Sequence, residues 1–105
     1  MSFKKREDAF ENKYARDEEL RFKVDIRRDK LVGIWAAEML GLKGDDADAY
    51  AKEVISADFE EPGEDDVVRK IMADFQEKEI DFSEHRLRKK MEELLEVAKQ
   101  QLMKE

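Results

Sequence analysis

The stretch from Glu7 to Gly41 constrains the fold most strongly, because it contains no proline and no glycine before Gly33. Almost every residue in it suits the interior of a helix. A single helix over this stretch would be about 50 Å long, at about 1.5 Å per residue. A compact protein of this chain length has a radius of gyration of only about 13 Å, so such a helix would project beyond the body against which it packs.

The apolar residues of this region form two stripes when they are placed around a helix at about 100° per residue. With Phe10 at zero, the first stripe lies near about 20° and the second near about 310°. The first contains Phe3, Phe10 and Tyr14, and the second contains Leu20, Val24, Leu31 and Trp35. The jump of about 70° falls between Tyr14 and Leu20. It predicts an N-terminal arm over residues 1–19 and a body over residues 20–105. The alternative is one long helix whose apolar stripe drifts as it curves around the core.

The composition predicts an all-helical protein with one domain. The chain has 105 residues, of which 47% are charged, with one proline and four glycines. Its formal net charge of −7 argues against nucleic acid as the main partner, because phosphate binding needs a basic surface. It has no cysteine and therefore no disulfide framework. No apolar run is long enough to span a bilayer, so we expect a cytoplasmic protein without direct membrane insertion.

Four helices are expected in the body: residues 20–40, 47–59, 64–79 and 83–103. Trp35 is expected in the core of the first, and Gly41 is expected to end that helix in a left-handed conformation. The third helix is expected to begin after a stop at residues 61–63. Gly44, Asp45 and Asp46 are expected to form the turn and N-cap of the second helix. Ser83, with Phe82 packing on Leu87, is favoured as the cap of the fourth helix, and Asp81 with Glu84 is the alternative. The fold class is thus an all-α, four-helix bundle with a long first helix and a mobile N-terminal arm. The short connections favour an antiparallel, up-and-down arrangement, and an orthogonal one is the alternative.

The arm contains few apolar residues, so we expect it to be disordered or frayed in the free protein and helical when bound. Aromatic anchors at helical spacing among charged residues are typical of a helix that binds in a groove of a partner protein. The candidate partner-binding residues are Phe3, Arg6, Glu7, Phe10, Glu11, Lys13, Tyr14 and Arg16. Binding to a membrane surface is a weaker alternative, because the polar face of the arm is mixed in sign rather than basic.

No catalytic or metal site is expected, and the protein is not expected to be an enzyme. His85 is the only histidine, and no serine is spaced to pair with it. The acidic clusters at residues 44–48 and 60–66 lack the ligand spacing of a calcium loop and indicate helix ends. Residues 41–44 lack the spacing of a phosphate-binding loop, and three aspartates follow them closely. No cofactor is predicted, and adenine nucleotide stays open as a ligand.

Several segments carry a resemblance to a known family. The N-terminal segment REDAFENKYARDEELRFK, from Arg6 to Lys23, resembles the N-terminus of the zeta subunit of alphaproteobacterial F-type ATP synthases. The segment LVGIWAAEMLG, from Leu31 to Gly41, looks like the central helix of that family. The segments AYAKEVISADFE, from Ala49, and KMEELL, from Lys90, are similar too. The resemblance covers essentially the whole chain, in order.

The resemblance implies a globular helical body and an N-terminal inhibitory arm. In that family the arm enters the catalytic head of the enzyme, between catalytic and non-catalytic subunits beside the rotor, and blocks ATP hydrolysis. The partner would be that head, at the inner face of the membrane, and the free protein is expected to be a monomer. Two alternatives stay open: a nucleotide-binding helical bundle that senses ATP or ADP, and a helical adaptor with another protein target.

Overall fold

The computed structural model describes residues 3–59 and 64–105, and the regular secondary structure of this part of the chain consists of α-helices only. Its five helices are α1 (Phe3–Arg16), α2 (Glu18–Met39), α3 (Asp45–Asp58), α4 (Asp65–Glu77) and α5 (Glu84–Met103). The molecule is elongated, with extents of 48 × 26 × 25 Å. The all-α class is therefore confirmed, with five helices where we expected four and an arm.

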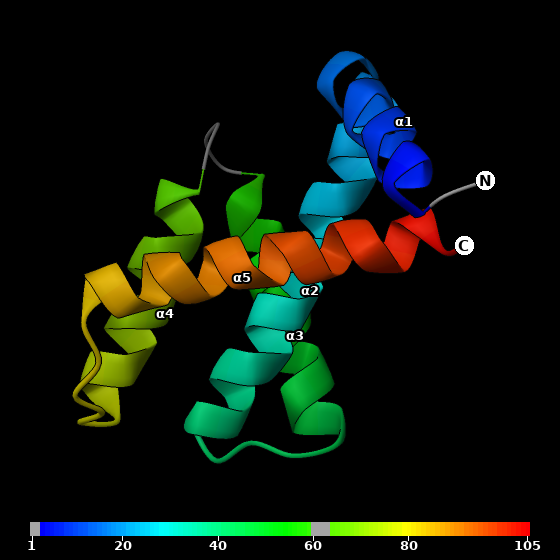
Figure 1. Cartoon of the computed structure of the whole chain (residues 1–105). Coiled ribbons are helices and arrows are strands. Elements are labelled where there is room, and N and C mark those ends of the chain that lie inside the picture. The colour runs from blue at the N-terminus through cyan, green and yellow to red at the C-terminus, as the bar shows by residue number, and fades with distance from the viewer. Residues whose placement is uncertain (1–2, 60–63) are drawn as a thin grey trace.

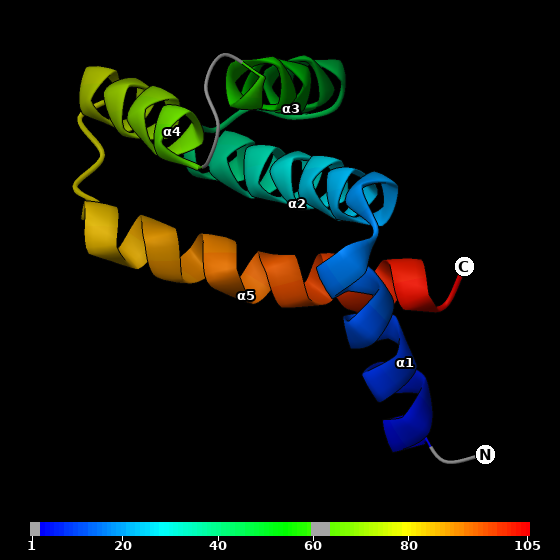
Figure 2. The same cartoon turned by 90° about the horizontal axis from the view of Figure 1, so that it is seen from above.

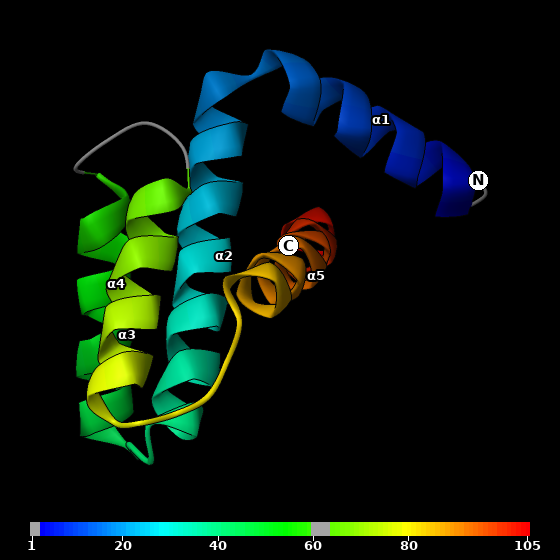
Figure 3. The ribbon, with the colours of Figure 1, turned by 90° about the vertical axis from the view of Figure 1, so that its left-hand side faces the viewer.

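The helices α2, α3 and α4 lie side by side, and α5 crosses them at a steep angle (Figure 1; Figure 3). The favoured up-and-down arrangement is therefore wrong, and the orthogonal alternative describes the body better. The connector after α4 explains the difference: Glu79 has a positive φ of 58°, and Ile80 N donates back to Phe75 O at 2.8 Å. This turn ends α4, and the chain then crosses the molecule before α5 begins.

The contact between α2 and α3 depends on small side chains. Gly33, Ala36 and Ala37 are buried on α2, and Ala51 is buried on α3. A Cβ atom on Gly33 would lie 2.6 Å from the Ala51 Cα atom, which is too close for two carbon atoms. Gly33 therefore allows the two helices to lie this close, because any side chain at this position would push them apart.

The core lies between α2, α3 and α4 and extends to the side of α5 that packs on α2 and α4. Its largest fully buried side chains include Phe75, Ile71, Leu87 and Met91. Trp35, which we expected inside the core, is only partly buried and packs at its edge. The prediction was wrong because α3 covers the face of α2 that carries small side chains. Leu31 and Trp35 lie on a different face of α2.

Asp17 separates α1 from α2. Its backbone is extended, with φ −102° and ψ 107°, and its carboxylate accepts hydrogen bonds from Glu19 N and Leu20 N. These bonds satisfy amide groups that the first turn of α2 would otherwise leave unpaired. The helix boundary thus falls inside the region where the apolar stripe jumps, and α1 turns away from α2 rather than continuing it (Figure 2).

Most of the other helix ends lie where the sequence predicted them. Gly41 has a positive φ of 81° after α2, and Ser83 accepts a hydrogen bond from Arg86 N at the start of α5. The N-cap of α3 is Gly44 rather than Asp45 or Asp46. Gly44 has φ 55° and ψ −126°, a backbone conformation that suits glycine, so the helix begins earlier and the aspartates occupy its first turn. The expected stop at residues 61–63 lies outside the described residues.

Candidate functional site

The candidate partner-binding residues lie along α1, which crosses near the C-terminal end of α5 (Figure 3). Phe10, Tyr14 and Glu7 are half-buried, whereas the side chains of Arg6, Glu11, Lys13 and Arg16 are exposed. Phe3 is the first residue of α1, and its side chain lies outside the described part. The two described aromatic anchors are therefore more covered than most of the polar residues around them.

Lys99 of α5 holds the C-terminal half of α1. Its Nζ atom lies 4.3 Å from the centre of the Tyr14 ring and 3.4 Å from Glu11 Oε2. Glu96, one turn earlier on α5, approaches the same ammonium group at 3.6 Å. Lys99 is only 12% exposed, so its cation–π contact and ion pair are partly shielded from water.

Phe10 lines a shallow hollow between α1 and the end of α5. The hollow has a volume of about 450 Å³ and is lined by Arg6, Ala9, Phe10, Lys13, Met103, Lys104 and Glu105. Arg27 of α2 fixes this end of α5, because it donates to Gln101 Oε1 at 3.0 Å and to Glu105 Oε1 at 2.6 Å. The surface that receives α1 is therefore itself tied to the body.

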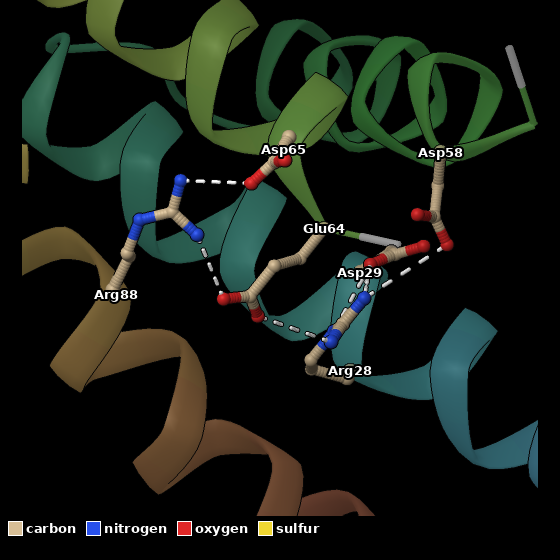
Figure 4. Close-up of polar contacts among 6 residues, drawn as sticks. All are labelled: Arg28, Asp29, Asp58, Glu64, Asp65 and Arg88. Atoms are coloured by element: carbon tan, nitrogen blue, oxygen red, sulfur yellow. Dashed lines mark hydrogen bonds and ion pairs between the residues drawn. The ribbon is translucent and has the colours of Figure 1, made fainter. Parts of the chain in front are cut away.

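A network of charged residues joins α2, α3, the start of α4 and α5 (Figure 4). Arg28 donates to Asp29 Oδ1 at 3.0 Å and lies 3.9 Å from Asp58 Oδ2 and 3.8 Å from Glu64 Oε2. Arg88 binds the other Glu64 oxygen at 3.0 Å and Asp65 Oδ1 at 2.9 Å. Glu64, at the start of α4, therefore bridges an arginine of α2 and an arginine of α5.

Asp29 is the most unusual member of this network, because it is fully buried and its Oδ2 atom has no hydrogen-bond partner among the described residues. Burial, first, and the nearby carboxylate of Asp58 raise the pKa of Asp29 to about 8, although Arg28 acts in the opposite direction. The folded protein therefore favours a proton on Asp29 near neutral pH.

Comparison with known proteins gives the family. The family model for the ATPase inhibitor subunit zeta matches residues 1–101. The chain belongs to this family. It is therefore a regulatory, non-catalytic protein, and its membership implies an interaction with ATP synthase.

A solved structure supports the same relationship. A protein whose structure was determined by solution NMR is 50% identical to this zeta-family chain, with a TM-score of 0.72. The match covers 81% of this chain and 96% of the other. No curated protein matches the chain.

The acidic clusters of this zeta-family member do not form a metal-binding cluster in the described residues. Within residues 3–59 and 64–105, no three or more potential metal ligands come together. Asp45, Asp46 and Asp48 form the first turn of α3, and residues 60–63 of the second acidic cluster lie outside the described residues. None of the helices that the structure describes is both long and apolar enough to cross a bilayer.

Sequence reasoning missed Lys99 and the basic residues at the start of α5. Lys99 and Glu11 lie 88 positions apart, so no local pattern joins them. The run from His85 to Lys90 carried a signal that could have been used, because Arg86 lies in the first helical turn, where the helix dipole disfavours a cation.

Proposed function

We propose that this chain inhibits ATP hydrolysis by F-type ATP synthase by inserting its N-terminal helix into the catalytic head. The observation that carries the proposal is the break at Asp17, which sets α1 apart from the body as a separate helix (Figure 2). Family membership supports the inhibitory role. The charged and aromatic composition of α1 supports it as the inserting element.

The anchors of the inserted helix are Phe3, Phe10 and Tyr14, which would enter an apolar groove of the head. Arg6, Glu7, Glu11, Lys13 and Arg16 would form the polar rim. Buried aromatic anchors surrounded by charged residues concentrate binding energy at few positions. The inhibition is then steric: a helix occupies an interface that must open and close in each catalytic cycle.

Insertion requires that α1 leave α5, because Tyr14 and Glu11 are engaged by Lys99. These contacts are weak enough to release. A cation–π contact at a partly exposed site is worth about 0.5–1 kcal/mol, and an exposed ion pair about 0.2–1 kcal/mol. The arm therefore exchanges between a docked and a released state in the free protein, and the released arm is mobile until it folds on the partner.

The partner is the catalytic head, with its catalytic, non-catalytic and rotor subunits, and the complex lies at the inner face of the membrane. The body, over residues 20–105, presents the arm and does not insert. The free protein is a monomer, since one copy per head is sufficient to block one interface.

Deletion of residues 1–16 tests the proposal while keeping Asp17 as the N-cap of α2. The truncated body should melt as cooperatively as the full chain, by circular dichroism, and should no longer inhibit ATP hydrolysis by the purified head. Full inhibition by the truncated body would contradict the arm mechanism. If the full chain neither inhibits nor binds the head, the proposed function fails as a whole.

A second candidate function is nucleotide sensing by the body. A hollow of about 330 Å³ beside α5 is lined in part by Arg28, His85, Arg88 and Lys89, which could face phosphate groups. Arg88 is already engaged by Glu64 and Asp65, which makes the site less available to an anion. Titration of the chain with ATP, followed by Trp35 fluorescence, tests this function, and the absence of a saturable change would count against it.

A further inference from the structure

A separate hollow of about 370 Å³ lies between α2 and the first turns of α5, away from α1. We call it the α2–α5 hollow. Its apolar residues are Trp35 and Met39 of α2 and Phe82 of the connector before α5. Its cations are Arg86, Lys89 and Lys90, all from α5.

The apolar floor is rigid because it rests on the core. The Trp35 and Phe82 rings lie 5.4 Å apart, and both pack against Phe75 with ring centres 6.0 and 5.6 Å away. Phe75 is fully buried, whereas Met39 is 39% exposed at the edge of the hollow. The floor is thus an accessible apolar surface held in place from below.

The cations are arranged around this floor. The Arg86 guanidinium lies 4.5 Å from the centre of the Phe82 ring, and Lys90 Nζ lies 5.8 Å from the centre of the Trp35 ring. Lys89 is exposed and forms no ion pair with the residues that the structure describes. The hollow contains one carboxylate, Glu93, which lies 3.8 Å from Lys90. The local charge is therefore positive in a chain whose net charge is −7.

We infer that the α2–α5 hollow docks an acidic segment of the ATP synthase that carries a large apolar side chain. The apolar side chain would cover Trp35 and Met39, and the carboxylates would face Arg86, Lys89 and Lys90. Charge complementarity favours this occupant, because Glu93 matches only Lys90, and a basic or neutral segment would leave Arg86 and Lys89 without a carboxylate in the hollow. The inference rests on the proposed function and adds a second contact, made by the body, to the one made by α1.

The two contacts can form together because they use opposite ends of α5. Lys99 receives α1, and Lys90 lies nine residues earlier, about 13 Å away along the helix axis at about 1.5 Å per residue. Release of α1 from Lys99 therefore leaves the α2–α5 hollow in place. A bound body would hold the released arm at a high effective concentration near its groove.

The test uses the full chain and its affinity for the purified catalytic head. The variant with Lys89→Glu and Lys90→Glu should bind about tenfold or more weakly than the wild type at low salt, because attraction becomes repulsion. Its affinity should also depend less steeply on salt. The matched control is Lys30→Glu with Lys52→Glu, which makes the same charge change at two exposed lysines of α2 and α3. Equal affinities of the two variants, both folded by circular dichroism, would overturn the inference.

A third variant separates this inference from the arm mechanism. The full chain with Phe10→Ala and Tyr14→Ala should still bind the head through its body, although it no longer inhibits. Complete loss of its binding would overturn the body contact. If this variant still inhibits, the proposed function is contradicted. The binding of the lysine variants then tests the body contact independently.

Nucleotide is the competing occupant, and ATP is the probe for it. The single variant Lys90→Glu is titrated with ATP while Trp35 fluorescence is followed, because Lys89 also lines the hollow of about 330 Å³ and Lys90 does not. An ATP response that Lys90→Glu loses, together with unchanged binding of this variant to the head, would assign the α2–α5 hollow to a nucleotide and overturn the inference.

Discussion

Lys99 holds Tyr14 by a cation–π contact, with 4.3 Å between the ammonium nitrogen and the centre of the ring. Because the same lysine binds Glu11, one side chain of α5 makes two of the contacts that dock α1. The contact joins the arm to the body at the residues that the proposed function assigns to the partner. Docking on α5 and insertion into the head are therefore mutually exclusive.

Replacement of Lys99 by alanine should release α1. The amides of α1 should exchange their hydrogens faster, and inhibition should strengthen by about two- to tenfold, because a larger fraction of the protein is competent to bind. The control is Lys52→Ala, at an exposed lysine of α3. Hydrogen exchange in α1 that is unchanged from the wild type would show that Lys99 does not hold the arm.

Replacement of Asp17 by alanine should weaken the start of α2 and alter the direction of α1. The loss of the hydrogen bonds to Glu19 N and Leu20 N should lower the free energy of unfolding by about 1 kcal/mol. Alanine also removes the helix stop, so helical circular dichroism should rise and a distance between labels at residues 10 and 103 should lengthen. Asp17→Asn retains a capping oxygen and should behave like the wild type. If the distance between the two labels is the same in Asp17→Ala as in the wild type, Asp17 is not what separates α1 from α2.

Gly33→Ala should destabilise the body despite the higher helix propensity of alanine. The new Cβ atom would lie 2.6 Å from the Ala51 Cα atom, so α2 and α3 must move apart. We expect a loss of about 1–3 kcal/mol in the free energy of unfolding, measured by urea denaturation. Ser56→Ala, at an exposed position of α3, should change it by less than about 0.5 kcal/mol. If Gly33→Ala is more stable than the wild type, the contact between α2 and α3 is less close than the structure shows.

Asp29 should make stability depend on pH. Its folded-state pKa of about 8 lies above the ordinary value of 3.8, so the folded protein binds a proton that the unfolded chain releases. The stabilisation from this proton is complete below about pH 4 and is lost as the pH rises through about 8. Burial also raises the pKa of Asp25 on the same helix, which adds a change of the same sign.

Asp29→Asn isolates this contribution, because asparagine is neutral at every pH. Relative to the wild type, the variant should gain stability between pH 5 and pH 9, as urea denaturation at each pH would measure. The neighbouring charges of Arg28, Asp58 and Glu64 are unchanged in the comparison. The control is Asp48→Asn, at an exposed site. Its free energy of unfolding, plotted against pH, should run nearly parallel to that of the wild type. A parallel curve for Asp29→Asn would mean that Asp29 is charged in the folded protein at neutral pH.

Local patterns in the sequence predicted most of the helices. The expected helix over residues 20–40 is observed as Glu18–Met39, and the expected helix over residues 83–103 as Glu84–Met103, with Ser83 as its cap. These features depend on caps, glycine and periodicity, which act over a few residues. The jump in the apolar stripe also fell at the boundary between α1 and α2.

The sequence did not predict which face of α2 is covered or how α5 crosses the body. Both depend on contacts between distant residues, such as the close approach of Gly33 to Ala51. The sequence analysis singled out neither Arg28 nor Asp29, because their burial depends on residues of α3 and α4 that are distant in the sequence. The role of the arm residues in partner binding stays a prediction, and the contact of α1 with Lys99 could not be predicted because it joins residues far apart in the sequence.

Inhibition by the aromatic anchors of α1 is measured as the ATP hydrolysis rate of the purified catalytic head at saturating inhibitor. The wild-type chain should slow hydrolysis, and the full chain with Phe10→Ala and Tyr14→Ala should not. The control with Lys30→Glu and Lys52→Glu should inhibit like the wild type. Inhibition by the Phe10→Ala, Tyr14→Ala chain equal to that of the wild type would contradict the account.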